Sequence, residues 1–75
     1  MKECNDGRKR LGELITLSRK KQEMTQLDLG NILNVSDKTI SKWERGAGYP
    51  DIRLIMPLAE ALHIDARDIL KEIDR

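Results

Sequence analysis

The segment TQLDLGNILNVSDKTISKWERG, residues 25–46, predicts two short helices joined by a tight turn. Thr25 and Ser36 are residue types that cap helix N-termini by accepting hydrogen bonds from backbone N–H groups. Asn34 lies between them and tolerates the left-handed conformation in which many helices end. The apolar side of both helices is supplied by Leu29, Leu33, Val35 and Ile40. The segment therefore predicts a helix pair that buries one side and exposes the other.

The outward side of the second helix carries only polar side chains. These are Asp37, Lys38, Thr39, Ser41 and Lys42. Such an edge presents hydrogen-bond donors, acceptors and short hydroxyl groups from the first turns of a helix. The major groove of DNA admits one α-helix and displays a distinct donor and acceptor pattern for each base pair. The pattern therefore predicts DNA binding.

The same segment closely resembles the helix-turn-helix of the Cro/phage-repressor (Xre-like) family of bacterial transcription regulators. The matching residues are Thr25-Gln26, Leu29, Leu33, Asn34-Val35-Ser36, Thr39-Ile40-Ser41, Trp43-Glu44-Arg45-Gly46, Tyr49-Pro50-Asp51 and Leu58-Ala59-Glu60-Ala61-Leu62. The resemblance extends from about Leu11 to Leu70, nearly the whole chain. One departure is Gly30, where the family usually carries Ala. Both residues are expected to allow close helix approach, although Gly weakens a helix.

The expected fold is all-α, a compact five-helix bundle of the phage-repressor DNA-binding type in which helices 2 and 3 form the helix-turn-helix. Residues 1–6 are expected to form a flexible arm, residues 7–72 the domain and residues 73–75 a tail. Apolar periodicity predicts a first helix over residues 7–22. Asp51 and Asp65 are expected to cap helices 4 and 5, of which the last ends near Glu72. His63 is expected at positive φ, where the family often has Gly.

Pro57 falls inside the fourth expected helix. Its missing N–H removes one backbone hydrogen bond, and its ring crowds the carbonyl group four residues earlier. We expect a kink near residues 53–56, because the apolar stripe continues through the proline without a change of period. A helix that begins late, with Pro57 in its first turn, is the alternative.

Length and composition exclude several classes of protein. Seventy-five residues make one small domain, without room for a second core that carries an enzyme pocket. Cys4 is the only cysteine and His63 the only histidine, so neither an internal disulfide nor a paired His or Cys metal site is expected. No phosphate-binding glycine loop occurs. We therefore expect no enzyme activity and no cofactor. No membrane-spanning run or signal-peptide core is found, which predicts a soluble, cytoplasmic chain.

The net charge of +1 is low for a protein that binds nucleic acid. The charges are unevenly distributed, because residues 1–24 hold seven Lys/Arg against four Asp/Glu, residues 25–50 three of each, and residues 51–75 four against six. A basic end suits DNA and an acidic end suits a partner, although an ordinary solvated surface would have the same charges.

The resemblance implies that a recognition helix at about residues 36–45 lies in the major groove. The base contacts it implies are Asp37, Lys38, Ser41 and Lys42. Lys38 and Lys42 suit guanine O6 and N7, and Asp37 suits the cytosine N4 donor. Two ordinary interpretations stay open. An acidic residue at a helix start is favoured by the helix dipole without DNA, and an exposed lysine can be merely solvated.

Contacts to the DNA backbone are implied at Gln26, Thr39, Arg45 and Tyr49. In the family the glutamine at the start of helix 2 typically bonds a phosphate and braces the recognition helix. Helix starts also attract anions through their free N–H groups. Thr39 suits a phosphate or a thymine methyl group. Weaker candidates are the basic residues of the first helix, Arg8, Lys9, Lys20 and Lys21.

Three residues near the recognition helix are expected to be structural. The resemblance pairs Arg19 with Glu44 as an ion pair that locks the recognition helix to helix 1. Removing one partner of such a pair costs about 3–5 kcal/mol if burial is deep. Trp43 is expected to pack in the core rather than to stack on bases.

The expected partner is a double-stranded DNA operator, bound by a homodimer, with no membrane involved. One recognition helix makes few base contacts, and two-fold pairing places two helices about 34 Å apart on a pseudo-palindrome. We expect the dimer surface on helix 5 and the chain end, where Ile64, Ile69 and Ile73 offer apolar area. Family members often continue into an effector segment, and the sequence does not distinguish an excised domain from a complete short regulator. The alternative function is a small helical protein-interaction module or antitoxin-type adaptor.

Overall fold

The computed structural model describes the backbone of residues 6–73 and the side chains of residues 8–73. Within these residues it has five α-helices and no strand: α1 (Asp6–Lys21), α2 (Gln26–Leu33), α3 (Asp37–Glu44), α4 (Ile52–Leu62) and α5 (Ala66–Ile73). The predicted all-α, five-helix fold is confirmed. The predicted arm and tail lie outside the described residues, except that α1 begins at Asp6 and α5 ends at Ile73.

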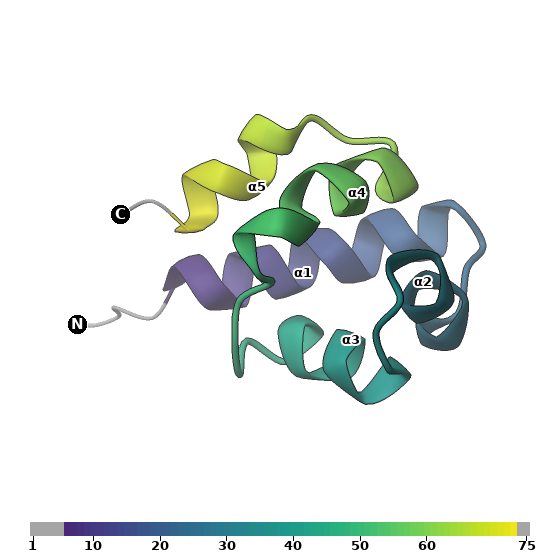
Figure 1. Cartoon of the computed structure of the whole chain (residues 1–75). Coiled ribbons are helices and arrows are strands. Elements are labelled where there is room, and N and C mark those ends of the chain that lie inside the picture. Colours follow the sequence, from purple (N-terminus) through teal and green to yellow (C-terminus); the bar gives the residue numbers. More distant parts are fainter. Residues whose placement is uncertain (1–5, 74–75) are drawn as a thin grey trace.

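The longest helix, α1, runs through the middle of the molecule. Helices α4 and α5 lie on one side of it, and α2 and α3 lie on the other (Figure 1). α1 contacts α3, α4 and α5, while α2 contacts α3 and α4. The helix-turn-helix pair is therefore held against a three-helix scaffold. No helix within residues 6–73 is both long enough and apolar enough to cross a membrane.

One apolar core is shared by all five helices. Its buried side chains are Leu11, Ile15, Leu29, Leu33, Ile40, Trp43, Ile55, Leu58, Ala59, Leu62 and Ile69. Burying one large aliphatic or aromatic side chain contributes about 1.5–3 kcal/mol, so the recognition pair is fixed by the same core as the scaffold. Trp43 is 4% exposed. This tryptophan packs in the core, as the sequence predicts.

The helix starts are capped where the sequence predicts. The Thr25 side chain accepts a 3.0 Å bond from the Asp28 N–H, and the Thr25 N–H donates to the Asp28 carboxylate at 2.9 Å. These reciprocal bonds form a capping box at the start of α2. They also hold the pKa of the Asp28 carboxyl below its ordinary value. Asp51 and Asp65 cap α4 and α5 in a similar way, each by accepting one backbone N–H bond.

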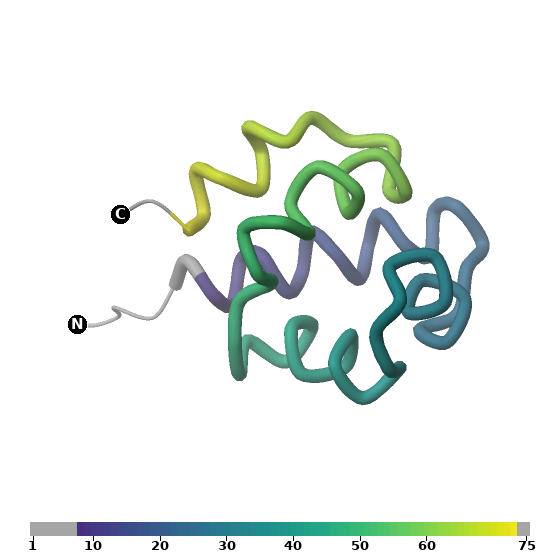
Figure 2. Tube along the Cα trace, viewed as in Figure 1, coloured from purple at the N-terminus to yellow at the C-terminus, as the bar shows by residue number. Residues whose placement is uncertain are grey.

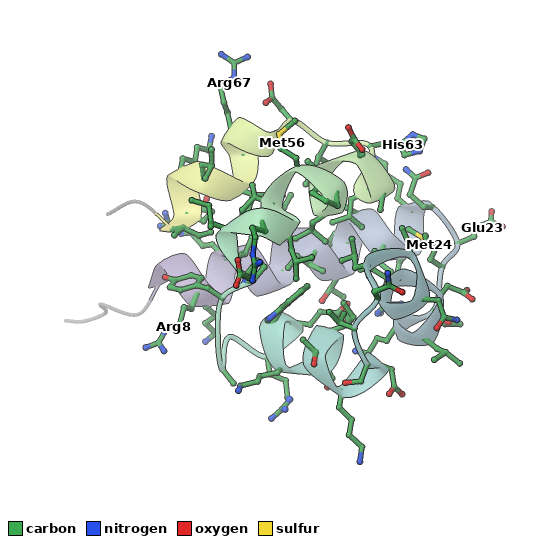
Figure 3. All side chains as sticks on the ribbon, viewed as in Figure 1. Arg8, Glu23, Met24, Met56, His63 and Arg67 are labelled. Atoms are coloured by element: carbon green, nitrogen blue, oxygen red, sulfur yellow. The ribbon has the colours of Figure 1, made fainter. Side chains whose placement is uncertain are left out.

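Each of the first four helices is followed, within two residues, by a residue at positive φ. These residues are Glu23, Asn34, Gly46 and His63. After each of them, the next backbone N–H bonds to the carbonyl group five residues earlier, which is the Schellman arrangement. The positive φ predicted for Asn34 and His63 is confirmed. Glu23 was not expected there, because glutamate has a β-carbon and no special tolerance of this conformation. Figure 3 shows Glu23 and His63 pointing outward from their turns.

The predicted position of Pro57 inside the fourth helix is confirmed. α4 begins at Ile52 and contains Pro57 in its interior, so the late-starting helix is excluded. The kink itself stays a prediction.

The expectation that Gly30 could equally be alanine is wrong, because a β-carbon there would lie 2.6 Å from the Val35 carbonyl oxygen. The close turn between α2 and α3 therefore depends on glycine at this position.

The dimer surface expected on helix 5 is also wrong at its central residue. Ile69 is fully buried, and Ile64 and Ile73 are half-buried and pack against the core. The apolar periodicity of α5 faces inward because α5 contacts both α1 and α4. This stripe therefore holds the bundle together.

Candidate nucleic-acid interface

α3 has one edge in the core and the opposite edge in solvent. Ile40 and Trp43 are buried on the inward edge. The outward edge bears Asp37, Lys38 and Lys42, which are exposed, and Ser41, which is half-buried. Among the described residues, the charged side chains of this edge form no ion pair. The four predicted base contacts thus share one accessible edge.

The first turn of α3 is fixed by two hydroxyl groups. The Thr39 N–H donates to the Ser36 Oγ at 3.2 Å, and the two side-chain hydroxyls lie 3.1 Å apart. A hydroxyl group offers one donor and two acceptor positions. Thr39, a predicted backbone contact, is therefore half-buried and anchored, and it keeps hydrogen-bonding capacity for a second partner.

The last turn of α3 is fixed by an ion pair with α1. Arg19 donates to both carboxylate oxygens of Glu44, at 2.7 Å from Nε to Oε2 and 3.2 Å from Nη2 to Oε1. The side chains are only 10% and 7% exposed. Arg19 also donates to the Met24 carbonyl at 2.8 Å, which joins the end of α1 to the same cluster. Two-point geometry of this kind fixes orientation as well as distance.

Gln26 completes this cluster from the start of α2. Its Nε2 donates a 3.0 Å hydrogen bond to Glu44 Oε1. Burial raises the pKa of the Glu44 carboxyl, but the hydrogen bonds from Arg19 and Gln26 and the charge of Arg19 outweigh burial and hold that pKa below its ordinary value. An amide nitrogen carries two N–H groups, so Gln26 has one left to donate. The residue predicted to contact phosphate thus braces the end of α3 directly.

The loop after α3 passes beside the stem of Lys42. Gly46 adopts a φ of 76°, and the chain then passes beside the start of α1 (Figure 2). A β-carbon at Gly48 would lie 3.4–3.9 Å from Cε, Cδ and Cγ of Lys42. The aliphatic stem of Lys42 is therefore laid along the loop backbone. Arg45 and Tyr49, both predicted contacts to the DNA backbone, are exposed, and in the sequence they flank the part of the loop that contains Gly48.

Two glycines that sequence reasoning missed also position the interface. Gly12 lies against the end of α3, where a β-carbon would be 2.8 Å from the Glu44 carbonyl carbon and 2.9 Å from the Trp43 oxygen. The backbone of Gly48 lies against the aliphatic stem of Lys42. A glycine inside an amphipathic helix is a signal of close helix approach, but it does not say which helix approaches. Within the described residues, no group of three His, Cys, Asp or Glu side chains is placed to hold a metal ion.

Comparison with known proteins identifies related chains. The sequence pattern of a helix-turn-helix family matches residues 16–69. Repressor protein C2 of Salmonella phage P22 is 36% identical over 61 residues, which cover 81% of this chain and 28% of the phage protein. The chain therefore spans less than a third of that relative.

Two solved structures of gene regulators are also similar to this chain. The P22 c2 repressor in complex with a synthetic operator has a TM-score of 0.77 at 35% identity, over 83% of this chain and 94% of the solved chain. The clp gene regulator ClgR from Corynebacterium glutamicum has a TM-score of 0.77 at 27% identity, over 88% of this chain and 70% of the solved one.

Proposed function

Because the chain belongs to the helix-turn-helix family, we propose that it binds a specific double-stranded DNA operator and regulates transcription as a repressor in the bacterial cytoplasm. Two comparisons support this proposal. The related phage protein is a repressor, and its solved structure contains a synthetic operator. ClgR, a second structural relative, is a gene regulator.

The single observation that carries the proposal is the division of α3 into two edges. The inward edge is buried, and the last turn is fixed by Arg19 and Gln26. The outward edge carries polar and charged side chains that form no ion pair with any other described residue. A rigid helix with a free polar edge matches the width and the hydrogen-bonding pattern of the major groove.

We assign base contacts to the outward edge of α3. Lys38 and Lys42 donate to guanine O6 and N7, Asp37 accepts from cytosine N4, and Ser41 donates or accepts. The stem of Lys42 already lies along the loop, so little side-chain freedom remains to be lost on binding.

Contacts to phosphate are assigned to the two ends of α3 and their neighbours. They are Gln26, Thr39, Arg45 and Tyr49. Gln26 uses the N–H that Glu44 leaves free, and Thr39 uses the hydroxyl capacity that Ser36 leaves free. Such contacts set the register of the protein on the duplex and supply the salt-dependent part of its affinity.

Two copies occupy one operator in this proposal. A single α3 offers too few base contacts for strong discrimination among genomic sites. Two copies related by a two-fold axis place their recognition helices about 34 Å apart, on successive turns of one face of the duplex. The expected operator is therefore a pseudo-palindrome.

The test is selection of bound duplexes from a random pool, repeated with Lys42→Ala. Wild-type protein is expected to enrich a two-fold symmetric sequence, and Lys42→Ala is expected to relax one position in each half-site at a cost of about 1–3 kcal/mol. Lys71→Ala is the matched control, because Lys71 is an exposed lysine on α5, away from α3. It is expected to change neither the sequence nor the affinity.

A small protein-interaction adaptor is the rival function, and its signature differs. Operator binding predicts an affinity that falls steeply with salt concentration, because each neutralised phosphate releases counterions. Enrichment of no sequence, together with binding that does not depend on salt, would favour the adaptor.

A further inference from the structure

Leu17 is an exposed apolar side chain near the C-terminal end of α1. It is 68% exposed, although the helix is otherwise anchored by fully buried Leu11 and Ile15. A hollow of 430 Å³ lies next to it and is lined by Glu13, Thr16, Leu17 and Glu44. Leu17 is thus a protruding side chain beside a hollow with room for another leucine.

Opposite charges flank Leu17 along the helix. Glu13 lies four residues before it and Lys20 three residues after it, and both are exposed. Seven residues make almost two full turns, so Glu13 and Lys20 lie on one line about 10 Å apart along the axis. No ion pair between described residues uses either side chain. Glu13, Leu17 and Lys20 therefore form a stripe that is acidic, then apolar, then basic from the N-terminus toward the C-terminus of α1.

We propose that α1 packs antiparallel on α1 of a second copy, with Leu17 of each copy in the hollow beside Leu17 of the other. The stripe is complementary to itself when one copy is reversed. Glu13 of each copy then meets Lys20 of the other, in two equivalent pairs. A two-fold contact requires this reciprocity, because the same patch serves both partners.

A second copy fits this surface better than it fits the other exposed apolar residues. Ile52 and Met56 are 79% and 59% exposed on α4, but neither lines one of the two hollows beside Leu17. A second hollow, on the other side of Leu17, is rimmed by Lys20 and Lys21. The charged side chains that line this second hollow are all basic, whereas Glu13 lines the first hollow and shares a line of the helix with Lys20. The complementary charges therefore favour the hollow that Glu13 lines.

The contact reaches the recognition helix only at its last residue, because Glu44 lines the hollow that receives Leu17 of the other copy. The exposed side chains of the outward edge, Asp37, Lys38 and Lys42, do not line this hollow. One helix face on each side makes a small interface, so the association belongs to the weak class. It needs no DNA, and its test is independent of operator binding.

The first experiment is sedimentation equilibrium of the full chain over rising concentration, without DNA. Wild-type protein is expected to dimerise in the high micromolar range, and Leu17→Ser is expected to weaken the dimer at least tenfold. Ile52→Ser is the matched control, because it removes a more exposed apolar side chain from another helix. Circular dichroism verifies that both variants are folded. A wild-type monomer at all concentrations, or a dimer lost with Ile52→Ser and kept with Leu17→Ser, overturns the proposal.

Charge reversal tests the register. Glu13→Lys alone and Lys20→Glu alone each place like charges opposite one another, and each is expected to weaken the homodimer about tenfold. An equal mixture of the two variants restores both attractive pairs, so it is expected to form a heterodimer as strong as the wild-type dimer. The double variant Glu13→Lys, Lys20→Glu is expected to dimerise like wild type. A mixture no stronger than the single variants excludes the antiparallel register.

Discussion

Arg19 and Glu44, which are 25 residues apart in sequence, form a two-point ion pair that ties α1 to the last turn of α3. Gln26 donates to the same carboxylate from the start of α2. The Glu44 carboxylate therefore joins α1 and α2 to the end of α3, and so fixes the direction of α3. Because both paired side chains are nearly covered, the loss of either charge leaves the other without an opposite charge and with only one neutral partner, Gln26 for Glu44 and the Met24 carbonyl for Arg19.

Arg19→Met is expected to destabilise the fold by about 3 kcal/mol, since it strands the Glu44 carboxylate. Urea unfolding followed by circular dichroism measures the change. Arg67→Met is the control, because Arg67 pairs with Asp65 at 3.0 Å but is 87% exposed. Figure 3 shows Arg67 projecting away from the molecule. The control is expected to cost at most about 1 kcal/mol. Equal losses in the two variants would contradict the role of burial.

Stability is expected to fall in acid, and Glu44 is expected to carry part of the fall. Its folded pKa lies below the ordinary value of 4.5, so the fold favours the ionised form. The stabilisation is present above the unfolded pKa and is lost as the pH falls through the folded pKa. Unfolding free energies measured between about pH 6 and pH 3 are expected to give a flatter curve for Glu44→Gln than for wild type. Some slope remains in that variant, because the pKa values of Asp28, Asp51 and Asp65 are also lowered. An unchanged slope in Glu44→Gln would refute the assignment.

Gly48→Val is expected to weaken operator binding about fivefold, because the valine side chain pushes the Lys42 stem off the loop. This loss of binding free energy is near the lower limit for one lost base contact. In a Lys42→Ala background the same substitution is expected to have no effect, because the displaced side chain is already gone. Ala47→Val, at the exposed neighbouring position, is the control. Binding constants for the four members of the cycle measure the coupling. Additive losses would show that Gly48 acts independently of Lys42.

Glu23→Gly is expected to stabilise the chain by about 0.5–1 kcal/mol, because Glu23 adopts a φ of 58° that costs a side-chain-bearing residue conformational energy. Thermal unfolding measures the change. Glu13→Gly, at an exposed interior position of α1, is expected to destabilise by about 1 kcal/mol. Opposite signs for one substitution at two glutamates would distinguish backbone strain from loss of charge.

Local chemistry is the part of the fold that the sequence predicts well. Thr25, Ser36, Asp51 and Asp65 cap helices because short oxygen-bearing side chains satisfy free N–H groups wherever a helix starts. Asn34 follows the same local logic at a helix end. Glu23 escapes this reasoning, since its strained conformation is imposed by the bonds of the next residues rather than by its own preference.

Prediction from sequence fails at particular tertiary contacts, although the burial of Trp43 and the Arg19–Glu44 pair are as predicted. Ile69 has the same apolar character as a dimer contact, and only the placement of α5 between α1 and α4 shows that it faces inward. The roles of Gly30 and Gly48 likewise follow only from the structure, which places the Val35 backbone against Gly30 and the Lys42 side chain against Gly48. The roles of Lys38, Lys42 and the phosphate contacts stay predictions, because they depend on a partner outside the fold.

The separation of the inward and outward edges of α3 also makes this domain adaptable. Ile40 and Trp43 pack in the core, whereas Asp37 and Lys38 are exposed and the stem of Lys42 lies against the loop at Gly48. Under the proposed function, substitutions on the outward edge are therefore expected to change which DNA sequence is bound while the unfolding temperature stays nearly constant.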